Sequence, residues 1–163
     1  MCRFTPENAE PVKLTCEFIY AGAYFDHAAA RIVSTSYDNT VRVWCLEGSR
    51  WEQQTVWKHN NQTGRWLVPF RARWGPVGRS VICGDMSRGV CTWGSPEQAA
   101  PSHVLRSEWM TAIPSRFAVD NISGVLAAAT SSGRIHLWTP PAPEGSAGER
   151  PSVGDCRAQC SVQ

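Results

Sequence analysis

The sequence predicts an all-β protein built from repeated units, and the spacing of its tryptophans leads to this expectation. Trp44, Trp93 and Trp138 recur at spacings of 49 and 45 residues, each at the end of a short apolar stretch. The alternation before each Trp is the pattern of a strand with one buried face. A composition with 13 Gly and 11 Pro in 163 residues fits a turn-rich globular chain and excludes collagen-like or wholly disordered ones.

The residues that precede the three tryptophans agree in register. Apolar or aromatic residues recur three, twelve and nineteen positions before each Trp: Val41, Val90 and Ile135; Ile32, Val81 and Leu126; Phe25, Trp74 and Val119. Turn-forming residues separate the last two strands of each unit, at 37–40, 85–89 and 131–133. Each unit is therefore expected to contain three strands up to its Trp and a fourth strand after it.

The first unit ends in a recognisable sequence motif. Its end, Ser36-Tyr37-Asp38-Asn39-Thr40-Val41-Arg42-Val43-Trp44, resembles the S-x-D-x-T-V-R-V-W core of the WD repeat. This resemblance implies a WD-repeat β-propeller in which Asp38 and Trp44 join a Ser or Thr and a His in a buried hydrogen-bonded tetrad. Ser87 and Ser132 stand at the Asp position of the other units, so packing around Trp93 and Trp138 is expected to hold those blades. An unrelated β-sandwich is the alternative, which three units in register disfavour.

The length predicts an incomplete ring. At about 45 residues per blade the chain holds roughly three blades, whereas propellers close with about four to eight. We expect about three blades of a seven-bladed ring in residues 19–139, after an N-terminal segment, 1–18, with the other blades lost by truncation, splicing or an incomplete gene. Residues 140–163 are rich in Pro, Gly and Ser and are predicted to be disordered. Cys156 and Cys160 in this tail lack the second pair that a zinc site needs.

A basic segment follows the first unit. Residues 53–84 contain no Asp or Glu. Arg and Lys neutralise phosphates, amides read base edges, and indoles stack on bases or wedge between them. The segment therefore supplies the candidate DNA-binding residues, which are Lys58, His59, Asn60, Gln62, Arg65, Trp66, Arg71 and Arg73.

The basic segment is expected to have two halves. Residues 59–64 are polar and predict a loop between blades, whereas residues 67–74 alternate and predict the inner strand of the next blade. In that strand Leu67, Pro69, Arg71 and Arg73 would share one face, and Val68, Phe70, Ala72 and Trp74 the other.

Two functions remain open from the residues alone. The first is DNA binding, which requires at least one of Trp57 and Trp66 to be exposed beside the arginines. The second is a protein-interaction scaffold that binds an acidic partner, such as a histone chaperone or a ligase subunit, and that could bury both indoles. In the second case Trp66 packs between blades and His59 is a structural loop residue.

The sequence of the basic segment points to one particular family of WD-repeat proteins. The run from His59 to Leu67 resembles the HN-x-x-TGRWL signature of the WD repeat-containing protein 76 family. Phe70–Trp74, Ala112–Phe117 and Ala129–Trp138 extend the likeness, which covers roughly Ala21 to Thr139. The resemblance implies a non-enzymatic, nuclear DNA-binding protein of the DNA-damage response, whose DNA is a damaged or distorted duplex.

This family is related to the small, DNA-reading subunit of the UV-damaged-DNA-binding complex. That subunit wedges a Phe-Gln-His triplet into the minor groove, and the triplet aligns with Gly64, Arg65 and Trp66 here. None of the three residues is identical, which leaves Trp66 as the candidate apolar wedge.

The same relatives are associated with cullin-RING ubiquitin ligases through a W-D-x-R motif, and with chromatin proteins. Cys45, Gly94 and Thr139 follow the three repeat tryptophans, so none of them begins this motif. Ligase docking is therefore expected only in blades outside this sequence.

Enzymatic functions find no support in the sequence. Neither a G-x-S-x-G motif nor a phosphate-binding loop occurs, and the four histidines are scattered: His27, His59, His103 and His136. The sequence predicts no catalytic residue, metal, cofactor or small-molecule substrate. No apolar run reaches the ~18 residues that a membrane span requires, and no membrane partner is expected.

Overall fold

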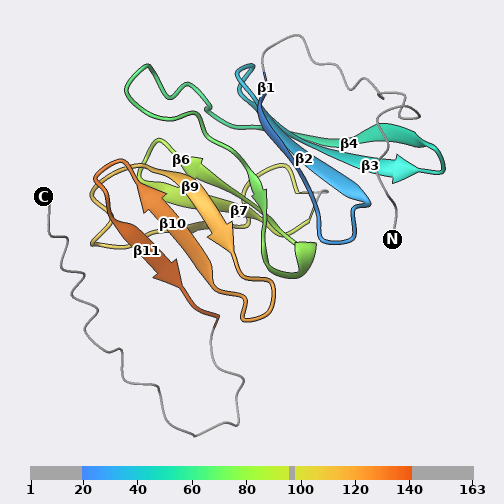
Figure 1. Ribbon diagram of the computed structural model, residues 1–163. Coiled ribbons are helices and arrows are strands. Elements are labelled where there is room, and N and C mark those ends of the chain that lie inside the picture. The colour runs from blue at the N-terminus through green and yellow to red at the C-terminus, as the bar shows by residue number, and fades with distance from the viewer. Residues whose placement is uncertain (1–19, 96–97, 141–163) are drawn as a thin grey trace, which may run out of the picture.

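A computed structural model describes residues 20–95 and 98–140 of the chain. In these residues the strands form three antiparallel sheets, and the described part contains no α-helix. Figure 1 shows the first sheet in blue to cyan, the third in orange, and the second in green between them. The predicted N-terminal segment, residues 1–18, lies outside the described residues. So does the predicted tail, residues 140–163, apart from Pro140.

Each sheet corresponds to one sequence repeat. The first comprises β1 (Tyr20–Phe25), β2 (Arg31–Ser36), β3 (Thr40–Glu47) and β4 (Arg50–Lys58). The second comprises β5 (Arg73–Trp74), β6 (Val81–Asp85), β7 (Gly89–Trp93) and β8 (His103–Leu105), with a short 3-10 helix (Pro76–Gly78) after β5. The third comprises β9 (Pro114–Val119), β10 (Leu126–Thr130) and β11 (Ile135–Trp138).

The predicted register is confirmed by the strand pairing. In the first sheet Phe25 pairs with Ile32 and Ile32 with Trp44, so the three marked positions of the repeat lie side by side. The equivalent rows are Trp74, Val81 and Trp93 in the second sheet, and Val119, Leu126 and Trp138 in the third. The expected fourth strand is present after Trp44 and Trp93, and the one expected after Trp138 falls outside the described residues.

Apolar layers hold neighbouring sheets together, as in successive blades. The larger cluster joins the first sheet to the second, and its most buried members include Val33, Val43, Trp57, Phe70 and Trp93. A smaller cluster joins the second sheet to the third: Ile82, Val90, Phe117, Leu126 and Ala128. The hydrophobic effect therefore stacks the sheets face to face.

The expected tetrad around Asp38 and Trp44 is not formed. Trp44 Nε1 donates to Ser34 Oγ at 2.9 Å, whereas Asp38 accepts from the Thr40 backbone N–H at 3.0 Å and forms an ion pair with Arg42. No histidine of the described segments bonds to either residue. Arg42 binds the Asp38 carboxylate, so the Asp38–Arg42 ion pair and the Trp44–Ser34 hydrogen bond are two separate interactions.

The second sheet lacks the Ser34 acceptor, and packing replaces it. Cys83 occupies the position of Ser34 in the second repeat, and the buried Trp93 Nε1 has no hydrogen-bond partner among the described residues. The Trp93 ring instead stacks on Trp57, with centroids 5.1 Å apart and planes 18° apart. This agrees with the expectation that packing holds this blade.

Candidate nucleic-acid interface

The basic segment forms a long loop between the first two blades. This first inter-blade loop (residues 59–72) runs from the end of β4 to the start of β5. The predicted strand over 67–74 is wrong except for Arg73 and Trp74. Tertiary partners take the place of a neighbouring strand: the Ala72 N–H donates to Thr35 Oγ1 at 2.8 Å, and the Pro69 carbonyl accepts from Arg116 at 2.7 Å.

The predicted faces hold only in the last part of the loop. Phe70, Ala72 and Trp74 are buried on one face, as expected. Leu67 is also buried, while Val68 is half exposed, which reverses their predicted placement. The alternation is lost there because the backbone of this stretch is not in a strand.

The buried side of the loop, called here the loop floor, consists of His59, Asn61, Leu67, Phe70 and Ala72. The His59 ring lies edge-on to Phe70 and Trp93, with centroids 5.9 and 5.6 Å away. Its Nδ1 lies 2.7 Å from Asn61 Oδ1. Burial lowers the pKa of His59 from its ordinary value, although the Asn61 contact opposes this shift.

Asn61 attaches the loop floor to the turn between β2 and β3. Its Nδ2 donates to the carbonyls of Ser36 and Thr40 at 2.8 and 2.9 Å, and its backbone N–H donates to Asn39 Oδ1 at 3.0 Å. A buried side chain with three bonds to one turn fixes the path of the loop. The outward-facing residues are therefore held in place from beneath.

The exposed side of the loop, called here the loop rim, consists of Lys58, at the end of β4, with Asn60, Gln62, Arg65, Trp66 and Arg71. The Trp66 side chain is 68% exposed, whereas Trp57 is 2% exposed. Lys58, Arg65 and Arg71 form no hydrogen bond or ion pair within residues 20–95 and 98–140. The structure thus brings unpaired cations and one exposed indole together on this loop.

The two rim amides help to order the loop. Asn60 Oδ1 accepts from the Gln62 backbone N–H at 3.1 Å, and Gln62 Nε2 donates to the Tyr37 carbonyl at 2.7 Å. Both side chains remain exposed, with part of their hydrogen-bonding capacity directed to solvent.

Three arginines meet beside the loop. The Arg73 guanidinium lies 3.6 Å from the centre of the Tyr24 ring, and Arg71 packs its methylenes against Gly22. Burial lowers the pKa of Arg116, and the charges of Arg71 and Arg73 lower it further. No carboxylate of the described segments pairs with any of the three.

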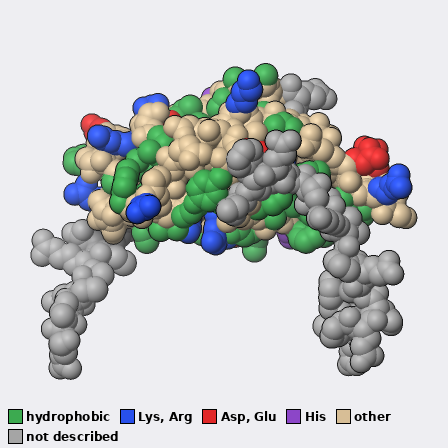
Figure 2. All heavy atoms as spheres, turned by 90° about the horizontal axis from the view of Figure 1, so that it is seen from above, with side chains coloured by type: hydrophobic (Ala, Val, Ile, Leu, Met, Phe, Trp, Pro, Cys, Tyr) green, Lys and Arg blue, Asp and Glu red, His purple; other side chains and the backbone are tan. Residues whose placement is uncertain are grey.

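Sequence reasoning missed Arg116 because it lies outside the basic segment. Its position two residues into β9 brings it back to the loop in space. Figure 2 shows Lys and Arg side chains at separate places around the molecule, with hydrophobic atoms exposed between them.

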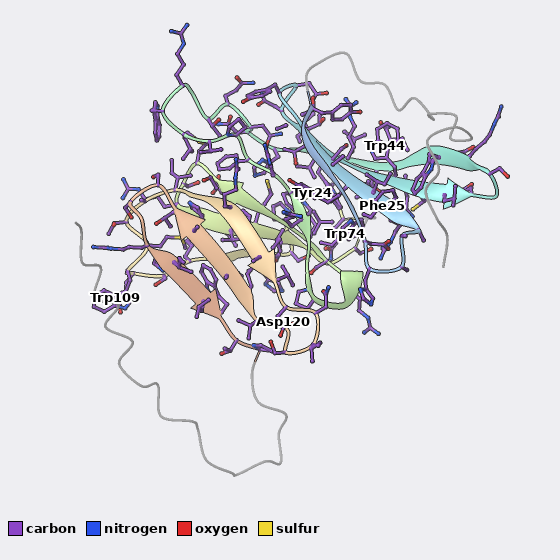
Figure 3. The ribbon with its side chains drawn as sticks, viewed as in Figure 1. Tyr24, Phe25, Trp44, Trp74, Trp109 and Asp120 are labelled. Carbon is purple, nitrogen blue, oxygen red and sulfur yellow. The ribbon has the colours of Figure 1, made fainter. Side chains whose placement is uncertain are left out.

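A cavity of about 360 Å³ lies near the C-terminal ends of the inner strands, and Tyr24, Asp26, Arg73, Trp74 and Phe117 are among the residues that line it. Figure 3 shows Tyr24 and Trp74 next to each other at this junction. Asp26 is paired with Arg31 at 2.9 Å, and although burial raises its pKa, hydrogen bonds from Arg31 and Ala30 bring the net shift downward. This carboxylate is already occupied within the fold.

Residues 20–95 and 98–140 show neither a metal-ion cluster nor a membrane-spanning helix. They contain no group of three or more His, Cys, Asp or Glu suited to a metal ion. No helix in these segments is long and apolar enough to cross a membrane.

Comparisons with known proteins place this geometry in context. The chain is 33% identical over 126 residues to WD repeat-containing protein 76 of Xenopus laevis, and 33% identical over 144 residues to the same protein of Rhinolophus ferrumequinum. These matches cover 72% and 83% of the chain. The resemblance to the WD repeat-containing protein 76 family is confirmed.

A fungal relative of WD repeat-containing protein 76 also matches. The DNA damage-binding protein cmr1 of Emericella nidulans is 30% identical over 135 residues, which cover 69% of this chain. The chain spans only 21% to 25% of the length of these curated relatives. No protein-family model matches the sequence.

A solved structure supports the fold independently. The β-propeller domain of Cps50 (Swd1) from Myceliophteria thermophila superposes with a TM-score of 0.60 at 11% identity, covering 76% of this chain and 41% of that one. The predicted propeller architecture is therefore confirmed, with three blades in the described residues.

Proposed function

We propose that this chain is the DNA-contacting part of a non-enzymatic, nuclear WD-repeat protein of the DNA-damage response, and that the loop rim contacts the DNA. One observation carries the proposal: the unpaired Lys58, Arg65 and Arg71 and an exposed Trp66 all lie on one loop that is fixed from beneath. The name of the fungal relative, a DNA damage-binding protein, supports the same ligand.

Each rim residue has a distinct role in this proposal. Lys58, Arg65 and Arg71 each neutralise one phosphate, and Arg73, next to the loop, neutralises a fourth. Trp66 stacks on a base or enters a distorted step, which favours damaged duplex over regular duplex.

The other predicted residues are Asn60 and Gln62 of the loop rim and His59 of the loop floor. Asn60 and Gln62 have capacity left for base edges after ordering the loop. His59 acts through position, because its ring is packed against Phe70 and Trp93. Any docking to a cullin-RING ligase or to chromatin proteins belongs to the parts of the relatives that this chain does not span.

Salt-dependent DNA binding tests the proposal. Four neutralised phosphates give a slope of log affinity against log salt near −3.6, at about −0.9 per phosphate. Fluorescence anisotropy with a labelled duplex at three salt concentrations should show this slope, and Arg71→Ala should flatten it by about one unit.

Arg50→Ala is the matched control, because Arg50 is exposed at the opposite end of β4 from Lys58. It should leave the slope unchanged. Equal slopes for the unmodified chain, Arg65→Ala and Arg71→Ala would overturn the DNA assignment. Binding to an acidic peptide with loss in the same variants would then favour the scaffold function.

A further inference from the structure

The loop between the second and third blades carries a second exposed tryptophan. This second inter-blade loop (residues 106–113) joins β8 to β9, just as the first inter-blade loop joins β4 to β5. The Trp109 side chain is 69% exposed, which matches the 68% of Trp66. Figure 3 shows Trp109 at the periphery of the molecule, outside the sheets.

The second loop holds this indole outward by fixing its neighbours. Met110 is buried at 4% exposure, and its N–H donates to the Ser107 carbonyl at 2.9 Å. The Trp109 N–H donates to Ser107 Oγ at 3.2 Å. Arg134 also reaches this loop, with contacts to the Trp109 carbonyl and Thr111 Oγ1 at 3.5 and 3.4 Å. The Trp109 indole is thus held on the surface by an anchored turn.

The two inter-blade loops lie at the same end of their blades and are connected. Both lead into the first strand of a blade, and the registers of the second and third sheets are equivalent. Phe70 of the first loop and the Pro114 carbonyl, where the second loop ends, both pack against Gly84; a Cβ there would lie 2.9 Å from Phe70 and 2.0 Å from that carbonyl. Arg116 also bonds to Pro69. The two indoles therefore stand on one continuous end of the molecule.

The charges of the second loop differ from those of the first. Glu108 lies between Arg106 and Trp109 in the sequence, and Arg106 is 4.0 Å from Asp85. The second inter-blade loop therefore has little net positive charge. Its contribution to binding a polyanion would come from stacking on the Trp109 indole and not from neutralising phosphates.

We propose that Trp66 and Trp109 form two stacking platforms for unpaired bases, so that a single strand of DNA spans two neighbouring blades. The inference rests on the proposed function and specifies its ligand as DNA with unpaired bases. Two rigid indoles on separate loops suit bases that are already unstacked, because stacking on aromatic rings tolerates any sequence. The cations of the loop rim follow the backbone of the same strand.

Single-residue variants of the full chain test the second platform. The probes are a fluorescein-labelled deoxythymidine oligonucleotide and a labelled blunt duplex, titrated at three salt concentrations. Trp109→Ala should weaken oligonucleotide binding by about 5- to 150-fold, which corresponds to ~1–3 kcal/mol per stacked base, with the salt slope unchanged. Trp66→Ala should produce a loss of the same order, and Trp109→Phe should restore most of the affinity.

Trp51→Ala is the matched control, since Trp51 lies near the start of β4 and packs on Phe25 with ring centroids 5.8 Å apart. It should leave the affinity unchanged, and thermal melts should show that Trp109→Ala folds like the unmodified chain. Unchanged affinity in Trp109→Ala, with a loss in Trp66→Ala, would overturn this inference and leave the proposed function standing. An unmodified chain that binds neither probe would overturn both.

Discussion

The floor and the rim of the first inter-blade loop place their side chains in opposite environments. The loop floor directs His59, Leu67 and Phe70 into the space between two blades, where Trp57 and Trp93 stack. The loop rim directs Arg65 and Trp66 into solvent. The difference shows that residue type alone does not distinguish a buried tryptophan, such as Trp57, from an exposed one, such as Trp66.

The largest difference is expected between Trp57, which packs in the cluster that includes the loop floor residues Leu67 and Phe70, and Trp66 of the loop rim. Trp57→Ala should lower the free energy of unfolding by ~3–5 kcal/mol, because it removes the stack on Trp93 and leaves a cavity. It also removes the bond from Trp57 Nε1 to the Gln98 carbonyl, at 2.6 Å. Thermal or urea unfolding measures the change. Trp66→Ala should change the free energy of unfolding by no more than about 0.5 kcal/mol. Equal losses in the two variants would show that Trp66 is a packing residue like Trp57.

A backbone substitution tests whether the rim depends on the shape of the loop. Gly64 has a φ of +68°, and an added Cβ would lie 3.0 Å from Trp66 Nε1. Gly64→Ala should cost about 1–2 kcal/mol from the left-handed backbone and should also weaken DNA binding by displacing the indole.

Gly48→Ala separates these two effects. Gly48 has a φ of +60° with no atom within 4 Å of its added Cβ. It should therefore show a similar cost in stability with unchanged DNA affinity. Unchanged DNA affinity in Gly64→Ala would show that the position of Trp66 does not matter.

The smallest expected effect is a pH dependence from the loop floor. Burial lowers the pKa of His59 below its ordinary 6.5, so the unfolded chain binds a proton more readily than the folded one. Stability from this residue is present above about pH 6.5 and is lost as the pH falls toward the folded pKa. Chemical unfolding at several pH values should show this decline, and His59→Gln should reduce it. If the stability of His59→Gln fell by the same amount at low pH, the pH dependence would come from other groups.

The sequence predicted the blades well because their register is local. Trp44, Trp93 and Trp138 each lie in a strand that pairs across one turn with the strand before it, so the repeat spacing is also the pairing pattern. The predicted tetrad is not formed, because Asp38 instead forms an ion pair with Arg42, four residues later in the sequence.

The site was predicted less completely because its geometry comes from tertiary contacts. Residues 67–72 alternate like a strand, yet their backbone bonds to Thr35 Oγ1 and the Arg116 side chain. Arg116 and Trp109 lie outside the basic segment, and no local pattern distinguishes them. Comparing equivalent inter-blade loops would have indicated Trp109.

Photo-crosslinking tests whether the loop rim binds DNA. The full chain is irradiated with an oligonucleotide that contains 5-iodouracil, and mass spectrometry of the peptides locates the attached residue. We expect attachment at Trp66, and we expect high salt to abolish both the attachment and the binding. Attachment confined to the opposite end of the blades, at Phe25 or Trp51, or no attachment under conditions of binding, would contradict it.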